Sequence, residues 1–237
     1  MQIIDNGGVV AAPLHHRLAS SWLFRSLSPA QAVKLQRELR LATYQPDELM
    51  FLEGEHGDRA HFICSGTVKT SRAIIDRPRY LRALLGPGDL VGVASFLDSG
   101  PRDLTAVAVT KVTTASITWE QLRTWCDQVP AIGLDLARER HARAREFETR
   151  ALHLALLDAS ARLAGLLLAL AKRFGVTEKG VVRVEHHLTQ DELAHLIGSS
   201  RETVCKSIQQ FTTRGWIQPT EGGVWLLKPD LLLRRAR

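Results

Sequence analysis

The chain is poor in cysteine. Its three cysteines are odd in number and lie far apart, at Cys64, Cys126 and Cys205. Neither a disulfide framework nor a zinc site has this spacing. We therefore expect a protein of the reducing cytoplasm that holds no metal.

Long hydrophobic runs are also missing. The longest apolar stretch, residues 163–171, covers about nine residues, whereas a membrane-spanning helix needs about 20. The first residues contain neither the basic start nor the apolar core of a secretory signal. These absences predict a cytoplasmic protein without a membrane partner.

Catalytic motifs are absent as well. The sequence contains no nucleophile–base pair at a recognisable spacing, no phosphate-binding P-loop and no cluster of metal ligands. We therefore expect that the protein is not an enzyme.

Basic residues, in contrast, are in excess. The 31 Lys+Arg and 25 Asp+Glu residues give a net charge of +6, which favours a polyanionic partner. Residues 158–237 contain 12 basic and 8 acidic residues, so +4 of this excess lies in the last third of the chain. A basic segment of this kind is typical of nucleic-acid binding.

Two helix starts of the same kind stand close together in that segment. Thr189 with Glu192, and Ser199 with Glu202, have the Ser/Thr-x-x-Glu spacing of a capping box. Gly198 between them can supply the positive φ of a tight turn. Two short helices joined in this way predict a helix-turn-helix, and side chains at the start of the second helix would reach base edges in the major groove.

The remaining segments complete an α+β fold. Ser28-Pro29 predicts the start of a helix that continues to about Leu41. Short β-type runs separated by glycines between residues 44 and 117 predict a small β-sandwich or β-roll. A helix is expected over 159–174. Two short strands around 221–223 predict a hairpin, which would form a wing behind the helix-turn-helix.

A long helix is predicted from Pro130 to about Leu157. Its middle is highly charged, but Ala137, Ala144 and Ala151 recur every seven residues, as do Phe147 and Leu154. Such a stripe indicates packing against a copy of the same helix, although a solvated surface helix remains the alternative.

The chain is identified as a member of the CRP/FNR family of bacterial transcription regulators from two stretches. Residues 86–92 and 100–106 resemble the family's phosphate-binding cassette, and residues 201–206, Arg-Glu-Thr-Val-Cys-Lys, resemble its recognition-helix core Arg-Glu-Thr-Val-Gly-Arg. The likeness extends over residues 22–230. It implies a flexible lead-in (1–20), an effector-sensing β-roll similar to cyclic-nucleotide-binding jelly rolls (21–128), a long dimerisation helix (129–157) and a winged helix-turn-helix (158–237).

The resemblance also implies the DNA contacts. Arg201 would bind a guanine edge, Glu202 would accept a hydrogen bond from a cytosine amino group, and Lys206 would meet a second guanine with less discrimination than arginine. Glu202 has a rival role as the capping residue of its own helix. Ser200 and Thr203 would hold phosphates. The other expected contacts lie at the two helix starts: Ser199, Thr189 and Gln190.

The implied effector site departs from the cyclic-AMP pattern. The family's Gly-Glu is Gly92-Val93 in this sequence, its Arg-Ser pair on the cyclic phosphate is Arg102-Asp103, and its adenine-reading Thr-Ser pair aligns with Phe147-Glu148. A carboxylate beside the phosphate position disfavours an anion. We therefore do not expect cyclic AMP bound in the familiar way. These residues remain the candidate effector site: Gly92, Val93, Arg102, Asp103, Phe147 and Glu148.

The sequence leaves open which signal regulates the protein. The alternatives are another small molecule or nucleotide, a gas or haem, oxidation of Cys205, and no effector at all. Haem-binding relatives place a histidine where this chain has Ala94, and His15, His16 and His61 are scattered in the manner of surface residues. The expected partners are double-stranded DNA with a near-palindromic site, a second copy of the chain, and RNA polymerase. A β-roll module of an enzyme is the remote alternative, which the winged helix disfavours.

Overall fold

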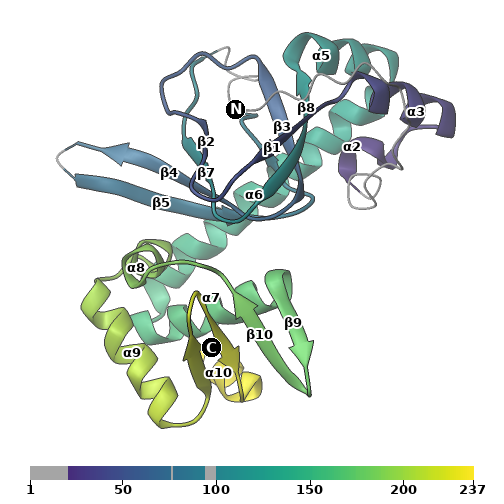
Figure 1. Ribbon diagram of the computed structural model, residues 1–237. Coiled ribbons are helices and arrows are strands. Elements are labelled where there is room, and N and C mark those ends of the chain that lie inside the picture. The colour runs from purple at the N-terminus through teal and green to yellow at the C-terminus, as the bar shows by residue number, and fades with distance from the viewer. Residues whose placement is uncertain (1–20, 76, 94–99) are drawn as a thin grey trace. The chain divides into compact units, whose positions relative to one another are not determined.

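The computed structural model describes residues 21–75, 77–93 and 100–237 (Figure 1). The expected lead-in 1–20, with His15 and His16, and Ala94 of the cassette lie outside these residues. The chain forms two compact units, Met1–Ala144 and Arg145–Arg237, whose boundary falls inside the long helix.

The N-terminal unit contains two four-stranded antiparallel sheets. The first, in the order β1-β8-β3-β6, consists of β1 (Arg40–Tyr44), β8 (Val112–Thr118), β3 (Arg59–Ser65) and β6 (Leu90–Val91). The second, in the order β2-β7-β4-β5, consists of β2 (Leu49–Phe51), β7 (Thr105–Ala108), β4 (Val68–Ile74) and β5 (Arg77–Leu85). The predicted β-roll is confirmed.

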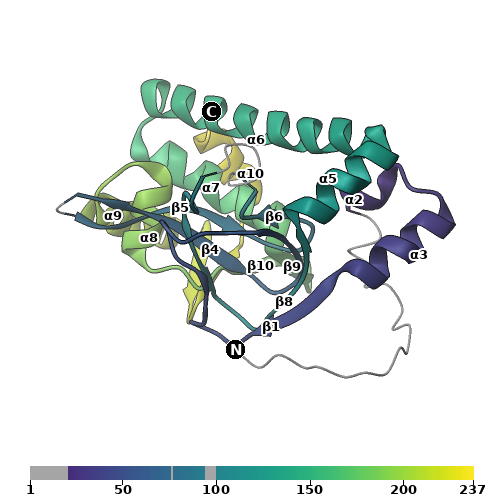
Figure 2. The ribbon, with the colours of Figure 1, turned by 90° about the horizontal axis from the view of Figure 1, so that it is seen from above.

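Both faces of the first sheet are buried. One face contributes Ile63 and Val112 to a core shared with Phe51 and Val68 of the second sheet. The other face packs against α2 (Trp22–Arg25), α3 (Pro29–Glu38), α5 (Trp119–Gln128) and the start of α6 (Pro130–Leu156). Figure 2 shows α2, α3 and α5 gathered at one end of this unit.

The first predicted helix was too long at its end. Ser28 caps α3 with a capping box and Pro29 stands in the first turn, as the sequence indicated. The helix ends at Glu38, however, and residues 40–44 pair with β8 from Arg40↔Ser116 to Tyr44↔Val112. Pairing with a strand about 70 residues away in sequence overrides the local helical pattern.

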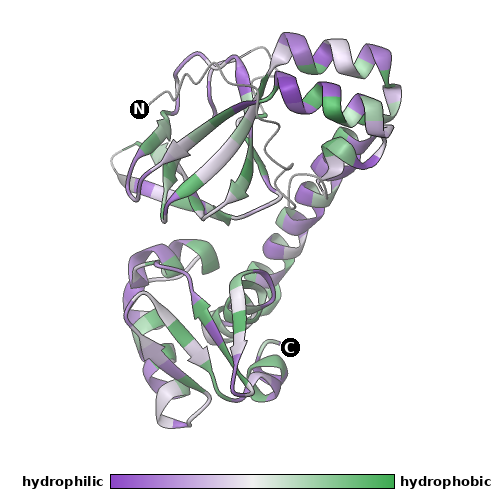
Figure 3. Ribbon diagram, turned by 45° about the vertical axis from the view of Figure 1, so that its right-hand side comes forward, coloured by the Kyte–Doolittle hydropathy of each residue, from purple (hydrophilic) through white to green (hydrophobic). Residues whose placement is uncertain are grey.

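Helix α6 has 27 residues and is therefore about 40 Å long. Ile132 and Leu136 near its start are buried in the N-terminal unit, whereas its middle is mostly hydrophilic (Figure 3). Five large apolar side chains on this helix are between 41% and 78% exposed: Leu134, Phe147, Leu152, Leu154 and Leu156. Phe147 and Leu154 of the predicted stripe are thus about half exposed, at 41% and 52%.

The C-terminal unit contains four helices that follow α6 and a small sheet. It comprises α7 (Ala159–Phe174), β9 (Gly175–Glu178), β10 (Val181–Glu185), α8 (Gln190–Ile197), α9 (Arg201–Thr213), β11 (Ile217–Thr220), β12 (Gly223–Leu226) and α10 (Pro229–Arg235). The predicted hairpin is β11-β12. It belongs to a four-stranded sheet in the order β11-β12-β10-β9, and the sequence analysis had not predicted β9, β10 or α10.

Acid is expected to destabilise the C-terminal unit through His186. This side chain is buried, and its Nδ1 accepts a hydrogen bond from the Leu188 N–H at 3.0 Å. Burial first, and the neighbouring His187 second, lower the pKa of His186 from 6.5 to about 4. The unfolded chain therefore binds the proton first as the pH falls below 6.5, so stability is lost between pH 6.5 and 4.

We expect this histidine to account for about 2 kcal/mol of stability lost between pH 7.5 and 5. Denaturant unfolding at the two pH values measures the loss. His186→Asn keeps an acceptor for the Leu188 N–H but does not titrate, and it should remove this share of the pH dependence. An unchanged pH dependence in that variant would contradict the assignment.

Candidate functional site

Helices α8 and α9 form the predicted helix-turn-helix. The Thr189 hydroxyl accepts the Glu192 N–H at 3.1 Å, while the Glu192 carboxylate accepts the Thr189 N–H at 2.8 Å. This capping box starts α8 as the sequence indicated. Gly198 ends α8 in the left-handed region, at φ 62°, so the predicted turn is confirmed.

The second capping box was predicted one residue too early. Ser200, not Ser199, caps α9, and its Oγ accepts the Thr203 N–H at 3.2 Å. Ser199 is used by the preceding turn, because its N–H donates to Ala194 O at 3.0 Å. Glu202 is therefore the second residue of α9 and not a capping-box partner, which removes the rival role expected for its carboxylate.

Helix α9 buries one face and exposes the other. Val204, Ser207 and Phe211 lie in the core, whereas Arg201 and Lys206 are exposed. The exposed face carries two adjoining surface hollows. The first is lined by Ser200, Arg201, Glu202, Cys205 and Lys206, and the second by Lys206, Gln209, Gln210, Thr213 and Arg214.

The sequence analysis missed the second half of this face. Arg201, Cys205, Gln209 and Thr213 recur every four residues, which is the spacing of side chains on one face of a helix. That spacing could have extended the candidate interface along the whole of α9.

Side chains at the start of α9 remain accessible although they make polar contacts. Arg201 is 66% exposed and lies 3.8 Å from the exposed carboxylate of Asp191, a surface pair that contributes little. The side-chain amide oxygen of Gln190, Oε1, accepts a hydrogen bond from the Cys205 thiol at 2.5 Å, which joins α9 to the start of α8. The Ser200 and Thr203 hydroxyls are 2.9 Å apart, and either can donate to the other.

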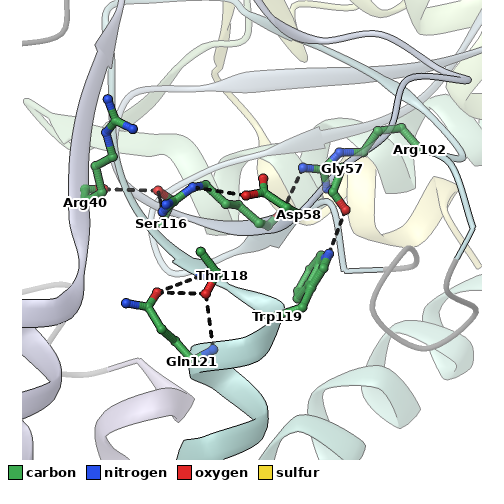
Figure 4. A network of polar contacts seen from close by, with 9 residues as sticks. Arg40, Gly57, Asp58, Arg102, Ser116, Thr118, Trp119 and Gln121 are labelled. Carbon is green, nitrogen blue, oxygen red and sulfur yellow. Dashed lines mark hydrogen bonds and ion pairs between the residues drawn. The ribbon is translucent and has the colours of Figure 1, made fainter.

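The β-roll arginine, in contrast, is buried. Arg102 is 5% exposed, and its guanidinium donates to Gly92 O at 2.7 Å and to Arg59 O at 2.8 Å. A Cβ atom on Gly57 would lie 2.1 Å from Arg102 Nε, so glycine is required for this close approach (Figure 4). The guanidinium also lies 4.4 Å above the Phe51 ring. Arg102 therefore connects main-chain segments of the β-roll.

The other residues of the expected effector site are buried, paired or exposed in ways that differ from the cyclic-AMP pattern. Val93, at the position of the ribose-binding Glu, is 3% exposed and belongs to the apolar core. Asp103 lies beside Arg102 in sequence, and its carboxylate pairs with Arg82 at 3.3 Å. Phe147 and Glu148 are exposed on α6. The arginine expected at the phosphate position thus donates to carbonyl groups, and valine replaces the carboxylate expected at the ribose position.

A further ion pair ties α6 to the β-roll of its own unit. Asp89 is buried and accepts the Gly86 N–H at 2.7 Å, and its other carboxylate oxygen pairs with Arg143 of α6. Arg143 also pairs with Glu139, one turn earlier, at 3.4 Å. The sequence analysis did not find this contact, because its two elements lie 54 residues apart.

Two other kinds of site were searched for in the part of the chain that the structure describes. It contains no helix that is both long and apolar enough to cross a membrane. The same residues contain no group of three or more His, Cys, Asp or Glu side chains placed to hold a metal ion.

Comparison with known proteins identifies the family. The family model "Cyclic nucleotide-binding domain" matches residues 41–129, and "Crp-like helix-turn-helix domain" matches residues 161–235. A Mycobacterium tuberculosis protein named "CRP-like cAMP-activated global transcriptional regulator" is 38% identical over 220 residues, which cover 93% of this chain and 98% of that protein. The chain belongs to the CRP/FNR family of transcription regulators.

Further relatives agree with this assignment. The CRP/FNR regulator is 29% identical over 215 residues to the "Cyclic AMP receptor protein" of Thermus thermophilus, covering 91% of this chain and 96% of that protein. A crystal structure of a CRP/FNR-family transcriptional regulator from the same organism superimposes with a TM-score of 0.70 at 26% identity, covering 83% of this chain and 98% of the other. These relatives are transcription regulators rather than enzymes.

Proposed function

We propose that this CRP/FNR regulator binds near-palindromic double-stranded DNA as a homodimer through α9. The observation that carries the proposal is the exposed face of α9, which begins with Arg201, Glu202 and Lys206. A helix of this kind fits the major groove, and its first residues then reach base edges.

Each residue at the start of α9 has a role in this proposal. Arg201 binds guanine O6 and N7 through its two-pronged guanidinium, Glu202 accepts from a cytosine amino group, and Lys206 meets a second guanine as a point charge. Ser200 and Thr203, with the free N–H groups of the helix start, hold a phosphate. The residues proposed to complete the backbone contacts are Ser199, Thr189 and Gln190.

The exposed apolar side chains of α6 support the binding of a second copy of the chain. We propose residues 129–157 as the dimerisation helix, because Phe147 and Leu154 are exposed and lie seven residues apart, as in a helix-pair seam. Two copies of α9 would then enter successive major grooves about 34 Å apart. The proposed boundaries are 21–128 for the sensing β-roll and 158–237 for the DNA-binding domain. We also propose that the regulator acts in the cytoplasm with RNA polymerase as a partner.

Control by cyclic AMP in the usual way is not part of the proposal. The buried hydrogen bonds of Arg102 and the apolar position of Val93 argue against it. The regulation that we propose first is by a different small ligand bound in the β-roll. A regulator without an effector is the alternative that the internal bonding of Arg102 favours. Haem, a gas and oxidation of Cys205 remain less supported forms of the same regulator.

Selection of bound duplexes from a random pool tests the proposal. The full-length protein should enrich sequences with two-fold symmetry whose half-sites are about 10–10.5 base pairs apart, and added cyclic AMP should leave the affinity unchanged. Enrichment of no sequence would overturn sequence-specific binding. A single asymmetric site would overturn the dimer, and tighter binding with cyclic AMP would overturn the conclusion about the β-roll.

A further inference from the structure

The Arg162 side chain joins three main-chain carbonyls from two other segments. Its Nε donates to Ile197 O at 2.7 Å, and one terminal nitrogen donates to Gly198 O at 3.2 Å. The other terminal nitrogen donates to Leu157 O, directly after α6. Arg162 lies in the first turns of α7, so one side chain connects α7, the end of α6 and the turn between α8 and α9.

The chemistry of these three acceptors requires an arginine. The last carbonyls of a helix have no partner within the helix, and Ile197 and Gly198 stand at the end of α8. A guanidinium presents several N–H groups in a fixed plane, and its positive charge is favourable at a helix C-terminus. A lysine ammonium at position 162 would be a point charge on a flexible stem and could not reproduce this geometry.

A second contact joins the same two segments. A Cβ atom on Gly198 would lie 2.5 Å from Leu154 Cδ2, so the last turns of α6 lie directly against the glycine of the turn. Ser200, only two residues later, caps α9. The turn that sets where α9 begins is therefore held from two sides, by Leu154 of α6 and by the Arg162 guanidinium.

We propose that Arg162 is a positioning residue that couples the end of α6 to the recognition helix. The inference rests on the proposed function, in which α9 enters the major groove. Because Arg162 bonds to both Leu157 O and the turn before α9, it holds the start of α9 against the end of α6. DNA affinity then depends on Arg162, although its guanidinium donates its hydrogen bonds to main-chain carbonyls.

The same end of α7 supplies a matched control. Asp158 caps α7, and its two carboxylate oxygens accept from Arg235 at 2.5 and 2.6 Å. Arg235→Gln removes a guanidinium that likewise bonds to the start of α7, but it does not touch the turn at Gly198. Arg162→Gln removes the guanidinium and its hydrogen bonds to that turn. Arg162→Lys retains the positive charge without the planar set of N–H donors.

The experiment measures DNA affinity, its salt dependence and amide hydrogen exchange in full-length variants. For Arg162→Gln we expect about tenfold weaker binding to the selected duplex, within the usual range of coupling between sites, with an unchanged salt slope. Exchange should become faster in peptides covering 196–203. Arg162→Lys should lie between Arg162→Gln and the wild type, and Arg235→Gln should leave affinity and exchange at 196–203 unaltered.

Other outcomes would overturn the inference. A lower melting temperature with unchanged affinity and exchange at 196–203 would make Arg162 a purely stabilising residue. A salt slope reduced by about one would make it a phosphate contact. If the wild-type protein bound no duplex, the proposed function would fail, whereas the exchange comparison would still decide whether Arg162 fixes the turn.

Discussion

Replacing Arg201 with alanine should cost about 1–3 kcal/mol of binding free energy in each half-site, or about 5- to 150-fold in affinity per half-site. The guanidinium is 66% exposed and bound only loosely by Asp191, so little is lost in the free protein when it is removed. The loss should fall on a single base pair of each half-site, because a bidentate contact reads one guanine. Affinities for all single-base variants of the duplex measure this directly.

The matched control is Arg123→Ala, which removes an exposed arginine from α5 in the N-terminal unit. This change should leave the base preference unaltered. If Arg201→Ala weakens binding equally on every variant duplex, then Arg201 contacts the DNA backbone, and its assignment to a base edge is wrong.

Arg102→Leu should destabilise the β-roll by about 3–6 kcal/mol, because it removes two hydrogen bonds from a charged group, which contribute roughly 1.5–3 kcal/mol each. The change leaves the carbonyls of Gly92 and Arg59 without their buried donor. It also removes the cation above the Phe51 ring. A loss of this size corresponds to a melting temperature about 10 °C lower, which calorimetry resolves.

A surface arginine of the same unit provides the comparison. Arg72 on β4 is 68% exposed and lies 3.7 Å from a Glu53 carboxylate oxygen, so Arg72→Leu should cost under about 1 kcal/mol. An Arg102→Leu protein as stable as the wild type would mean that Arg102 does not hold the β-roll together. The guanidinium would then be free for an anionic ligand, as the family pattern first indicated.

Local signals made most of the C-terminal unit predictable. The Thr189 capping box and the left-handed Gly198 depend on neighbouring residues alone, and both were found from the sequence. Ser199 was misassigned as a cap because two adjacent serines offer the same hydroxyl. The choice between them is made by the preceding turn, which uses the Ser199 N–H.

Contacts between residues far apart in sequence limited the prediction of the remaining elements. Strand β1 forms because residues 40–44 pair with β8, and β10 forms because it pairs with β12. In neither case does the local sequence of the strand show which strand it pairs with. The same limit applied to Arg102, which the family pattern placed on a ligand phosphate. The sequence shows the arginine but not that Arg59 and Gly92 supply its acceptors.

Methylation interference tests most directly whether α9 reads the major groove. Dimethyl sulfate modifies guanine N7 in the major groove and adenine N3 in the minor groove, so the two grooves are distinguished in one experiment. We expect guanine methylation to block binding at symmetric positions in two half-sites about 10–10.5 base pairs apart. Arg201→Ala should abolish the interference at one guanine of each half-site. Interference at adenines alone, or at no base, would contradict the placement of Arg201 and its helix in the major groove.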